Sequence, residues 1–173
     1  PVEGGYLYDF HYPNVVDFCF FFTFAYHTML AHATAVQRYR ALGQDGQIGI
    51  ILNLTPPYPR SQHPADLKAA NIADLMFNRS FLDPAVKGEY PAELVELLRE
   101  YDQLPVCEPG DKALLAAGKI DLLGVNYYQP RRIKARSHAV NPASPFMPEW
   151  FFDYYEMPGR KMNPHRGWEI YEQ

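Results

Sequence analysis

The sequence predicts an α/β fold with parallel strands, because short apolar runs alternate with segments of helical periodicity. Residues 48–54 (IGIILNL) and residues 120–128 (IDLLGVNYY) are the two runs, and each is continuously apolar rather than alternating. Continuous apolar character is typical of a parallel strand that is covered on both faces. Three helical stretches lie between the two runs, which gives the alternating order of an α/β protein.

The length allows one domain and little more, since the chain has 173 residues. Two strands cannot form a free-standing sheet with both faces covered. A complete barrel of parallel strands and helices needs about 250 residues. We therefore expect residues 1–173 to form a single incomplete segment of a larger α/β fold.

Caps and breaker residues define the first elements along the chain. Residues 1–17 mix glycine, proline and aromatic residues and are expected to form a loop. Asp17 is a suitable N-cap for a helix that ends at Gly43. Residues 18–24 (FCFFFTF) of this helix are apolar almost all round. That turn is therefore either buried on several sides or prone to aggregation.

The later elements follow from proline positions and apolar spacing. Residues 55–59 (TPPYP) are expected to form a rigid loop. Three helices are predicted over residues 64–78, 91–101 and 111–117. Residues 131–163 form a long, proline-rich and aromatic loop, and loops of this length are usually functional. A last helix is expected to begin near Gly167.

Composition and charge exclude several classes of protein. Lysine and arginine number 16 and aspartate and glutamate 20, so the net charge is −4, which argues against a nucleic-acid partner. The longest apolar run near the start, residues 18–22, is far shorter than the roughly 18 residues of a membrane span, so no membrane partner is expected. No signal peptide is visible. Two cysteines, Cys19 and Cys107, are too few for a disulfide scaffold. We therefore expect a soluble, cytoplasmic segment.

Polar side chains end both predicted strands, where ligands gather in α/β folds. The first strand ends at Asn53, and the second ends at Asn126, Tyr127 and Tyr128. Amides and phenols at such ends bind hydroxyl-rich ligands, and Trp168 adds an aromatic face for stacking. The alternative is structural: asparagine ends strands because it favours turns, and aromatic rings pack against one another.

The other motifs in the sequence give weaker evidence of a functional site. His27 and His32 are five residues apart, which does not place two zinc ligands on one helical face, so no metal is expected. No glycine-rich phosphate loop, nucleophile elbow or paired-cysteine motif occurs. A basic cluster after the second strand either meets an anionic substrate or lies on a solvated loop. It consists of Arg131, Arg132, Lys134 and Arg136.

Several stretches, in this order and spacing, resemble family 1 glycoside hydrolases. They are residues 31–36 (AHATAV), 48–53 (IGIILN), 77–84 (FNRSFLDP), 88–91 (GEYP) and 123–128 (LGVNYY). Residues 5–13 (GYLYDFHYP) and 163–171 (NPHRGWEIY) resemble the bacterial 6-phospho-β-glucosidase branch. Residues 20–24 depart from the family, which usually carries mixed polar residues there. The resemblance implies part of a TIM (β/α)8 barrel, from the loop after strand four to the start of the helix after strand six.

The resemblance also implies an activity, namely a retaining β-glycosidase that hydrolyses 6-phospho-β-glucosides or β-glucosides. Both catalytic glutamates of the family would lie outside this chain, one before Pro1 and one beyond Gln173. Tyr128 would hydrogen-bond the nucleophile, Asn126 would line the sugar site, and Trp168 would form the aromatic wall against the aglycone. Asn53 would lie at the floor of the pocket. No metal or organic cofactor is needed.

Two functional hypotheses follow from this resemblance. In the first, the ligand is a small-molecule β-glycoside, with or without a 6-phosphate, and the isolated chain is inactive because it lacks the carboxylates. In the second, the chain is a non-catalytic remnant or interaction module whose exposed aromatic residues contact other chains. We also expect that the protein can associate into a homo-oligomer, and a defined oligomer favours the second hypothesis.

Overall fold

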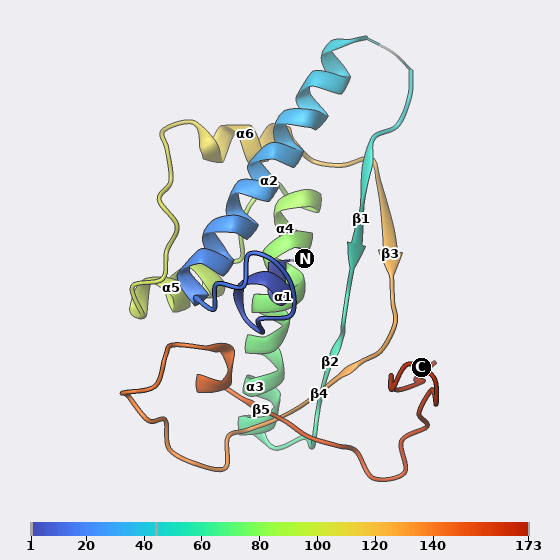
Figure 1. The fold of residues 1–173 in the computed structure, drawn as a ribbon. Coiled ribbons are helices and arrows are strands. Elements are labelled where there is room, and N and C mark those ends of the chain that lie inside the picture. The colour runs from blue at the N-terminus through green and yellow to red at the C-terminus, as the bar shows by residue number, and fades with distance from the viewer. Residues whose placement is uncertain (1, 44, 173) are drawn as a thin grey trace.

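The computed structural model describes residues 2–43 and 45–172, so Pro1, Gln44 and Gln173 lie outside the described residues. Figure 1 shows helices gathered on one side of a narrow ribbon of strands. The elements in chain order are α1 (Val2–Tyr6), α2 (Phe18–Ala41), β1 (Gly49–Asn53), β2 (Pro57–Pro59), α3 (Pro64–Asp74), a π-helical turn (Leu75–Arg79), α4 (Ser80–Val86), α5 (Ala92–Glu100), α6 (Asp111–Ala117), β3 (Leu122–Asn126), β4 (Arg131–Lys134), a 3₁₀ turn (Pro148–Trp150) and β5 (Asp153–Tyr154). The predicted α/β order is confirmed.

The two apolar runs form neighbouring parallel strands, as predicted. β1 pairs with β3 from Gly49 opposite Leu122 to Asn53 opposite Asn126. Further along, β2 pairs in parallel with β4, and β4 pairs in antiparallel fashion with β5. The two parallel pairs follow one another down the same side of the molecule (Figure 1). The carboxyl ends of β1 and β3 therefore meet at the same level.

Only one face of the β1–β3 pair is covered by helices. Leu52 is buried, and Ile50 packs against a cluster on α2, α4 and α6 that includes Met29 and Ala85. On the opposite face Ile51 is 68% exposed. Among the described residues no second layer lies over the face of Ile51, so this segment covers one face of its strands, and coverage of both faces remains an expectation for the larger fold.

The phenylalanine-rich turn of α2 is buried on one side and exposed on the other. The Asp17 carboxylate caps the helix by accepting a 2.9 Å hydrogen bond from the Phe20 amide, as predicted. Phe21 and Phe22 are buried in the main core, whereas Phe20 and Phe24 are exposed. The Phe24 ring nevertheless contacts Tyr6 on α1, with ring centroids 5.2 Å apart. The expected burial therefore holds for Phe21 and Phe22 but not for Phe20 and Phe24.

Pairing over long sequence distances explains where the sequence predictions of loops fail. Residues 2–6 form α1 instead of a loop, and residues 57–59 form β2 despite two prolines. Residues 131–163 contain β4 and β5 and are not one long loop. The predicted helix near Gly167 does not form, because Glu169 pairs with Met162 in an isolated β-bridge.

The remaining predicted helices form, but the helical region predicted over residues 64–78 continues to Val86. Helices α5 and α6 lie within the predicted ranges, and α3 continues through the π-helical turn into α4. Within residues 2–43 and 45–172, no helix is both long enough and apolar enough to cross a membrane.

Candidate active site

The carboxyl ends of β1 and β3 carry an amide pair. Asn126 donates a hydrogen bond of 2.8 Å from Nδ2 to Oδ1 of Asn53. Two residues after Asn53, Thr55 is held by Asn78 of the π-helical turn, whose side chain accepts from the Thr55 amide at 3.0 Å and donates to the Thr55 carbonyl at 3.2 Å. The helical layer thus fixes the exit of β1, and the amide pair lies at the end of the sheet where α/β proteins bind ligands.

Two aromatic side chains meet just beyond the amide pair. Tyr128 lies two residues after the end of β3, and its ring lies 5.2 Å from the ring of Trp168, with the two planes tilted by 46°. Tyr128 is 52% exposed, so its phenol is accessible at the end of the strand. Trp168 comes from the C-terminal segment, which the structure brings back to the end of β3. The four predicted site residues therefore form two contacting pairs.

A buried ion pair lies behind Trp168. The Arg132 guanidinium on β4 donates to both oxygens of Glu169, at 2.5 Å from Nη2 to Oε1 and 3.2 Å from Nε to Oε2. The hydrogen bonds to Glu169 raise the pKa of Arg132 and outweigh its burial, which acts in the opposite direction. Arg132 therefore stays charged.

Arg131 ties the start of β4 to the N-terminal helix. It donates to Thr55 Oγ1 at 2.7 Å, to the Tyr154 hydroxyl at 3.0 Å and to Glu3 at 2.6 Å. Its guanidinium also lies over the Phe77 ring, 3.9 Å from the centroid. Burial is the largest single effect and acts to lower the pKa of Arg131, but the Glu3 carboxylate together with Tyr154 and Tyr8 raises the pKa above its ordinary value. The side chain is therefore a structural tie and not a free cation.

The basic cluster predicted from the sequence is thus engaged within the chain. Lys134 lies 3.7 Å from the Asp153 carboxylate, and Arg136 donates to the carbonyls of His138, Ala139 and Glu149. Arg131 and Arg132 are paired with Glu3 and Glu169. All four basic side chains therefore bind groups of this chain, which fits neither a solvated loop nor an open site for an anionic substrate. Sequence reasoning missed Glu3 and Glu169 as partners, because no spacing rule connects residues so far apart.

A cavity of about 320 Å³ opens beside the C-terminal segment. Its lining includes Gln129, Arg131, Arg132, Tyr155, Gly167 and Glu169. The residues on either side of Trp168 in the chain thus face this cavity. Gln129, the residue after Tyr128 in the chain, also lines it, and the cavity provides room for a group larger than water.

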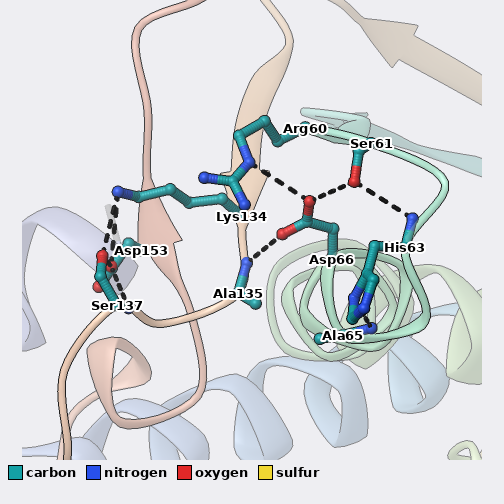
Figure 2. A network of polar contacts seen from close by, with 9 residues as sticks. All are labelled: Arg60, Ser61, His63, Ala65, Asp66, Lys134, Ala135, Ser137 and Asp153. Atoms are coloured by element: carbon teal, nitrogen blue, oxygen red, sulfur yellow. Dashed lines mark hydrogen bonds and ion pairs between the residues drawn. The ribbon is translucent and has the colours of Figure 1, made fainter.

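A second polar network holds the turn after β4 against the start of α3 (Figure 2). The buried Asp66 carboxylate accepts from Ser61 Oγ at 2.6 Å and from the Ala135 amide at 2.7 Å, and Arg60 Nε lies 3.4 Å away. The hydrogen bonds from Ser61 and Ala135 lower the pKa of Asp66. This network lies at the far end of the β2–β4 pair and has a structural role.

The described residues offer no metal centre. Among residues 2–43 and 45–172, no three histidine, cysteine, aspartate or glutamate side chains are grouped to hold an ion. His27 instead contacts the Thr23 carbonyl through Nδ1, at 2.9 Å within α2.

Comparison with known proteins identifies the family. Residues 2–164 match the family model described as Glycosyl hydrolase family 1, and the chain therefore belongs to that family. Over all 173 residues it is 63% identical to the 6-phospho-beta-glucosidase GmuD of Bacillus subtilis (strain 168), of which it covers 37%. It is 37% identical over 125 residues to the aryl-phospho-beta-D-glucosidase BglC of the same organism, covering 72% of this chain and 26% of BglC.

Solved structures place the fold in the same family. The virulence factor SghA from Agrobacterium tumefaciens superposes with a TM-score of 0.81 at 30% identity, covering 98% of this chain and 35% of SghA. The family 1 β-glucosidase from Thermotoga maritima gives a TM-score of 0.74 at 28% identity, with 98% and 35% covered. The chain is thus part of a TIM barrel and spans about a third of the length of these relatives.

Proposed function

We propose that this chain forms one wall of the sugar site in a retaining 6-phospho-β-glucosidase, with both catalytic glutamates contributed from outside the chain. The observation that carries the proposal is the 63% identity over all 173 residues to GmuD, a 6-phospho-beta-glucosidase. The position of the amide pair at the carboxyl ends of β1 and β3 supports it, because that end of a TIM barrel holds the active site.

Retaining glycosidases use two carboxyl groups about 5–5.5 Å apart. One carboxylic acid protonates the leaving oxygen and the other carboxylate attacks the anomeric carbon; the first group then activates the water that releases the sugar. In this scheme the Tyr128 hydroxyl donates a hydrogen bond to the attacking carboxylate, which keeps it ionised and fixes its orientation. The accessible phenol of Tyr128 at the end of β3 supports that role.

The other site residues bind the two sides of the scissile bond. The hydrogen bond between Asn126 and Asn53 orients both amides, so that Asn126 presents its Oδ1 and Asn53 its Nδ2 to sugar hydroxyls. Trp168 packs its ring against the aglycone, beside Tyr128.

Both cysteines are free thiols in the described structure. A reducing compartment fits such thiols, so we propose a cytoplasmic enzyme.

The test inserts this 173-residue segment into GmuD in place of the corresponding part of GmuD. The product is a complete barrel, which we call the hybrid enzyme. The substrates are p-nitrophenyl β-D-glucoside 6-phosphate and its unphosphorylated form. We expect the hybrid enzyme to hydrolyse the phosphorylated substrate with the higher kcat/KM. The isolated 173-residue chain should show no turnover above the blank. Turnover by the isolated chain, or equal kcat/KM on both substrates, would contradict the proposal.

Exposed aromatic residues favour the second candidate, a non-catalytic interaction module. Phe10 and Tyr12 are 83% and 87% exposed in the segment between α1 and α2. Size-exclusion chromatography of the isolated chain separates the two candidates. A defined oligomer that unfolds cooperatively supports the module, whereas a monomer contradicts it.

A further inference from the structure

Trp168 lies in a segment that has little regular structure of its own. An isolated bridge joins Met162 to Glu169, and the Asn163 amide donates to the Trp168 carbonyl at 2.8 Å. These contacts shape the segment internally. They do not connect it to β3, so something else must fix Trp168 relative to Tyr128.

The buried pair of Arg132 and Glu169 connects this segment to β4. Their side chains are only 6% and 4% exposed. Glu169 is the immediate neighbour of Trp168 in the chain, and Arg132 lies on β4, which follows Tyr128 by a few residues. The pair therefore links the backbone on either side of the Tyr128–Trp168 contact.

Aromatic side chains enclose the pair and restrict its movement. The Arg132 guanidinium lies 5.1 Å from the Tyr58 ring and 4.3 Å from the Tyr171 ring. The hydroxyl of Tyr127 donates to the Tyr171 carbonyl at 2.9 Å. Glu169 and Tyr171 are two residues apart and both contact Arg132, as expected for an extended segment with alternate side chains on one side.

We propose that the Arg132–Glu169 pair is a positioning device that holds Trp168 against Tyr128 and thereby shapes the leaving-group side of the site. The proposal rests on the proposed function, because it takes Trp168 as the aglycone wall. Neither residue needs to contact substrate. A buried ion pair contributes little net stability after its desolvation, but its bidentate geometry fixes orientation. Replacing one partner should therefore displace Trp168 and weaken binding of the leaving group.

The first readout measures the position of Trp168 directly, in the 173-residue chain labelled with 5-fluorotryptophan. The chain has two tryptophans, so the ¹⁹F NMR spectrum should contain two resonances, which Trp168→Phe assigns. Trp150 donates to the Pro145 carbonyl at 2.9 Å, away from the pair, and serves as an internal reference for folding. We expect Glu169→Gln and Arg132→Lys to shift and broaden the Trp168 resonance while the Trp150 resonance stays in place.

The matched control makes the same chemical change at an exposed ion pair. Glu96 pairs with Arg99 at 2.5 Å on α5, and Glu96→Gln should leave both resonances unchanged. Should Arg132→Lys fail to fold, Glu169→Gln decides the question. An unshifted Trp168 resonance in Glu169→Gln overturns the proposal. So does a collapse of both resonances in Glu169→Gln, because that result shows a global structural role.

The second readout uses the hybrid enzyme and an aryl leaving group. Glu169→Gln should raise KM about tenfold with little change in kcat, because the displaced Trp168 loses uniform binding of the aglycone. A lower kcat at unchanged KM overturns the positioning role. If the unsubstituted hybrid enzyme has no activity on either glucoside, the proposed function fails, whereas the ¹⁹F spectra still decide whether the pair positions Trp168.

Discussion

The side-chain amide of Asn126 donates to the side-chain oxygen of Asn53 across 2.8 Å, and the same two residues are the last register partners of β1 and β3. The strand pairing thus delivers two amides to one point at the carboxyl end of the sheet. Each amide orients the other, so a change at one should affect the binding contributed by both.

Removal of the Asn126 amide should impair the hybrid enzyme. Asn126→Ala deletes the donor to Asn53 and the proposed acceptor for a sugar hydroxyl, so kcat/KM should fall about 10- to 100-fold. Steady-state kinetics on the phosphorylated glucoside measures the change. Asn71→Ala is the control, because Asn71 donates to Glu93 at 3.1 Å on the exposed side of α3. Equal losses in the two variants would place Asn126 outside the site.

The phenol of Tyr128 should matter more for kcat than for folding. Tyr128→Phe keeps the ring that contacts Trp168 and removes only the hydroxyl that we assign to the nucleophile. We expect kcat of the hybrid enzyme to fall about tenfold or more, with an unchanged melting temperature. Tyr12→Phe, at a highly exposed phenol, is the comparison. A kcat within twofold of the parent would remove the proposed role of Tyr128.

The local sequence predicts the elements of this chain better than the contacts between them. Asp17 and the apolar runs of β1 and β3 carry their own signals, which are a cap and continuous hydrophobicity. Strand β2 carries two prolines and no such signal. It forms because β4 pairs with it, from Pro57 opposite Arg131. Tertiary pairing here overrides a local preference.

The candidate site divides in the same way. Asn53, Asn126 and Tyr128 could be predicted, because they end strands. Glu169 could not, since its importance comes from Arg132, which lies 37 residues earlier. A charged residue beside a tryptophan is usually solvated, and only the fold shows that this one is buried and paired.

Replacing either of two glycines of the β1–β3 pair by alanine should reduce the stability of the chain by different amounts. A Cβ at Gly49 would overlap the backbone carbonyl oxygen of Leu122, whereas one at Gly124 would lie 2.8 Å from the Ile51 side chain. Ile51 is exposed and can rotate away. Gly49→Ala should therefore destabilise the chain by about 1–3 kcal/mol and Gly124→Ala by less than about 1 kcal/mol. Urea unfolding measures both, and a reversed order would contradict the strand register.

Substitutions on the buried and the exposed side of the phenylalanine-rich turn should change the free energy of unfolding by different amounts. Phe21 is fully buried, and Phe21→Ala should lower the free energy of unfolding by about 3–5 kcal/mol through loss of apolar contact and a residual cavity. Phe20 is exposed, and Phe20→Ala should cost less than about 1 kcal/mol. Chemical denaturation of the two variants tests this. Similar losses would mean that the turn is buried all round.

Acid should weaken the contribution of Asp66 to stability. Its pKa is lowered in the folded chain from an ordinary value of 3.8, chiefly by hydrogen bonds from Ser61 and the Ala135 amide. A group whose pKa is lower in the folded state stabilises fully above its unfolded pKa, and this stabilisation disappears as the pH falls through the folded pKa.

Asp66→Asn should therefore lower the free energy of unfolding by about 1–3 kcal/mol near neutral pH, because it removes an acceptor for Ser61. The difference between the parent chain and the variant should shrink as the pH falls from about 5 to about 2. Urea titrations at several pH values measure that difference, which cancels the titration of the other carboxylates. Glu96→Gln is the control and should differ little from the parent at any pH, since its ion pair is exposed. A difference for Asp66→Asn that stays constant down to low pH would show that packing, and not the charge of Asp66, holds the turn after β4 against α3.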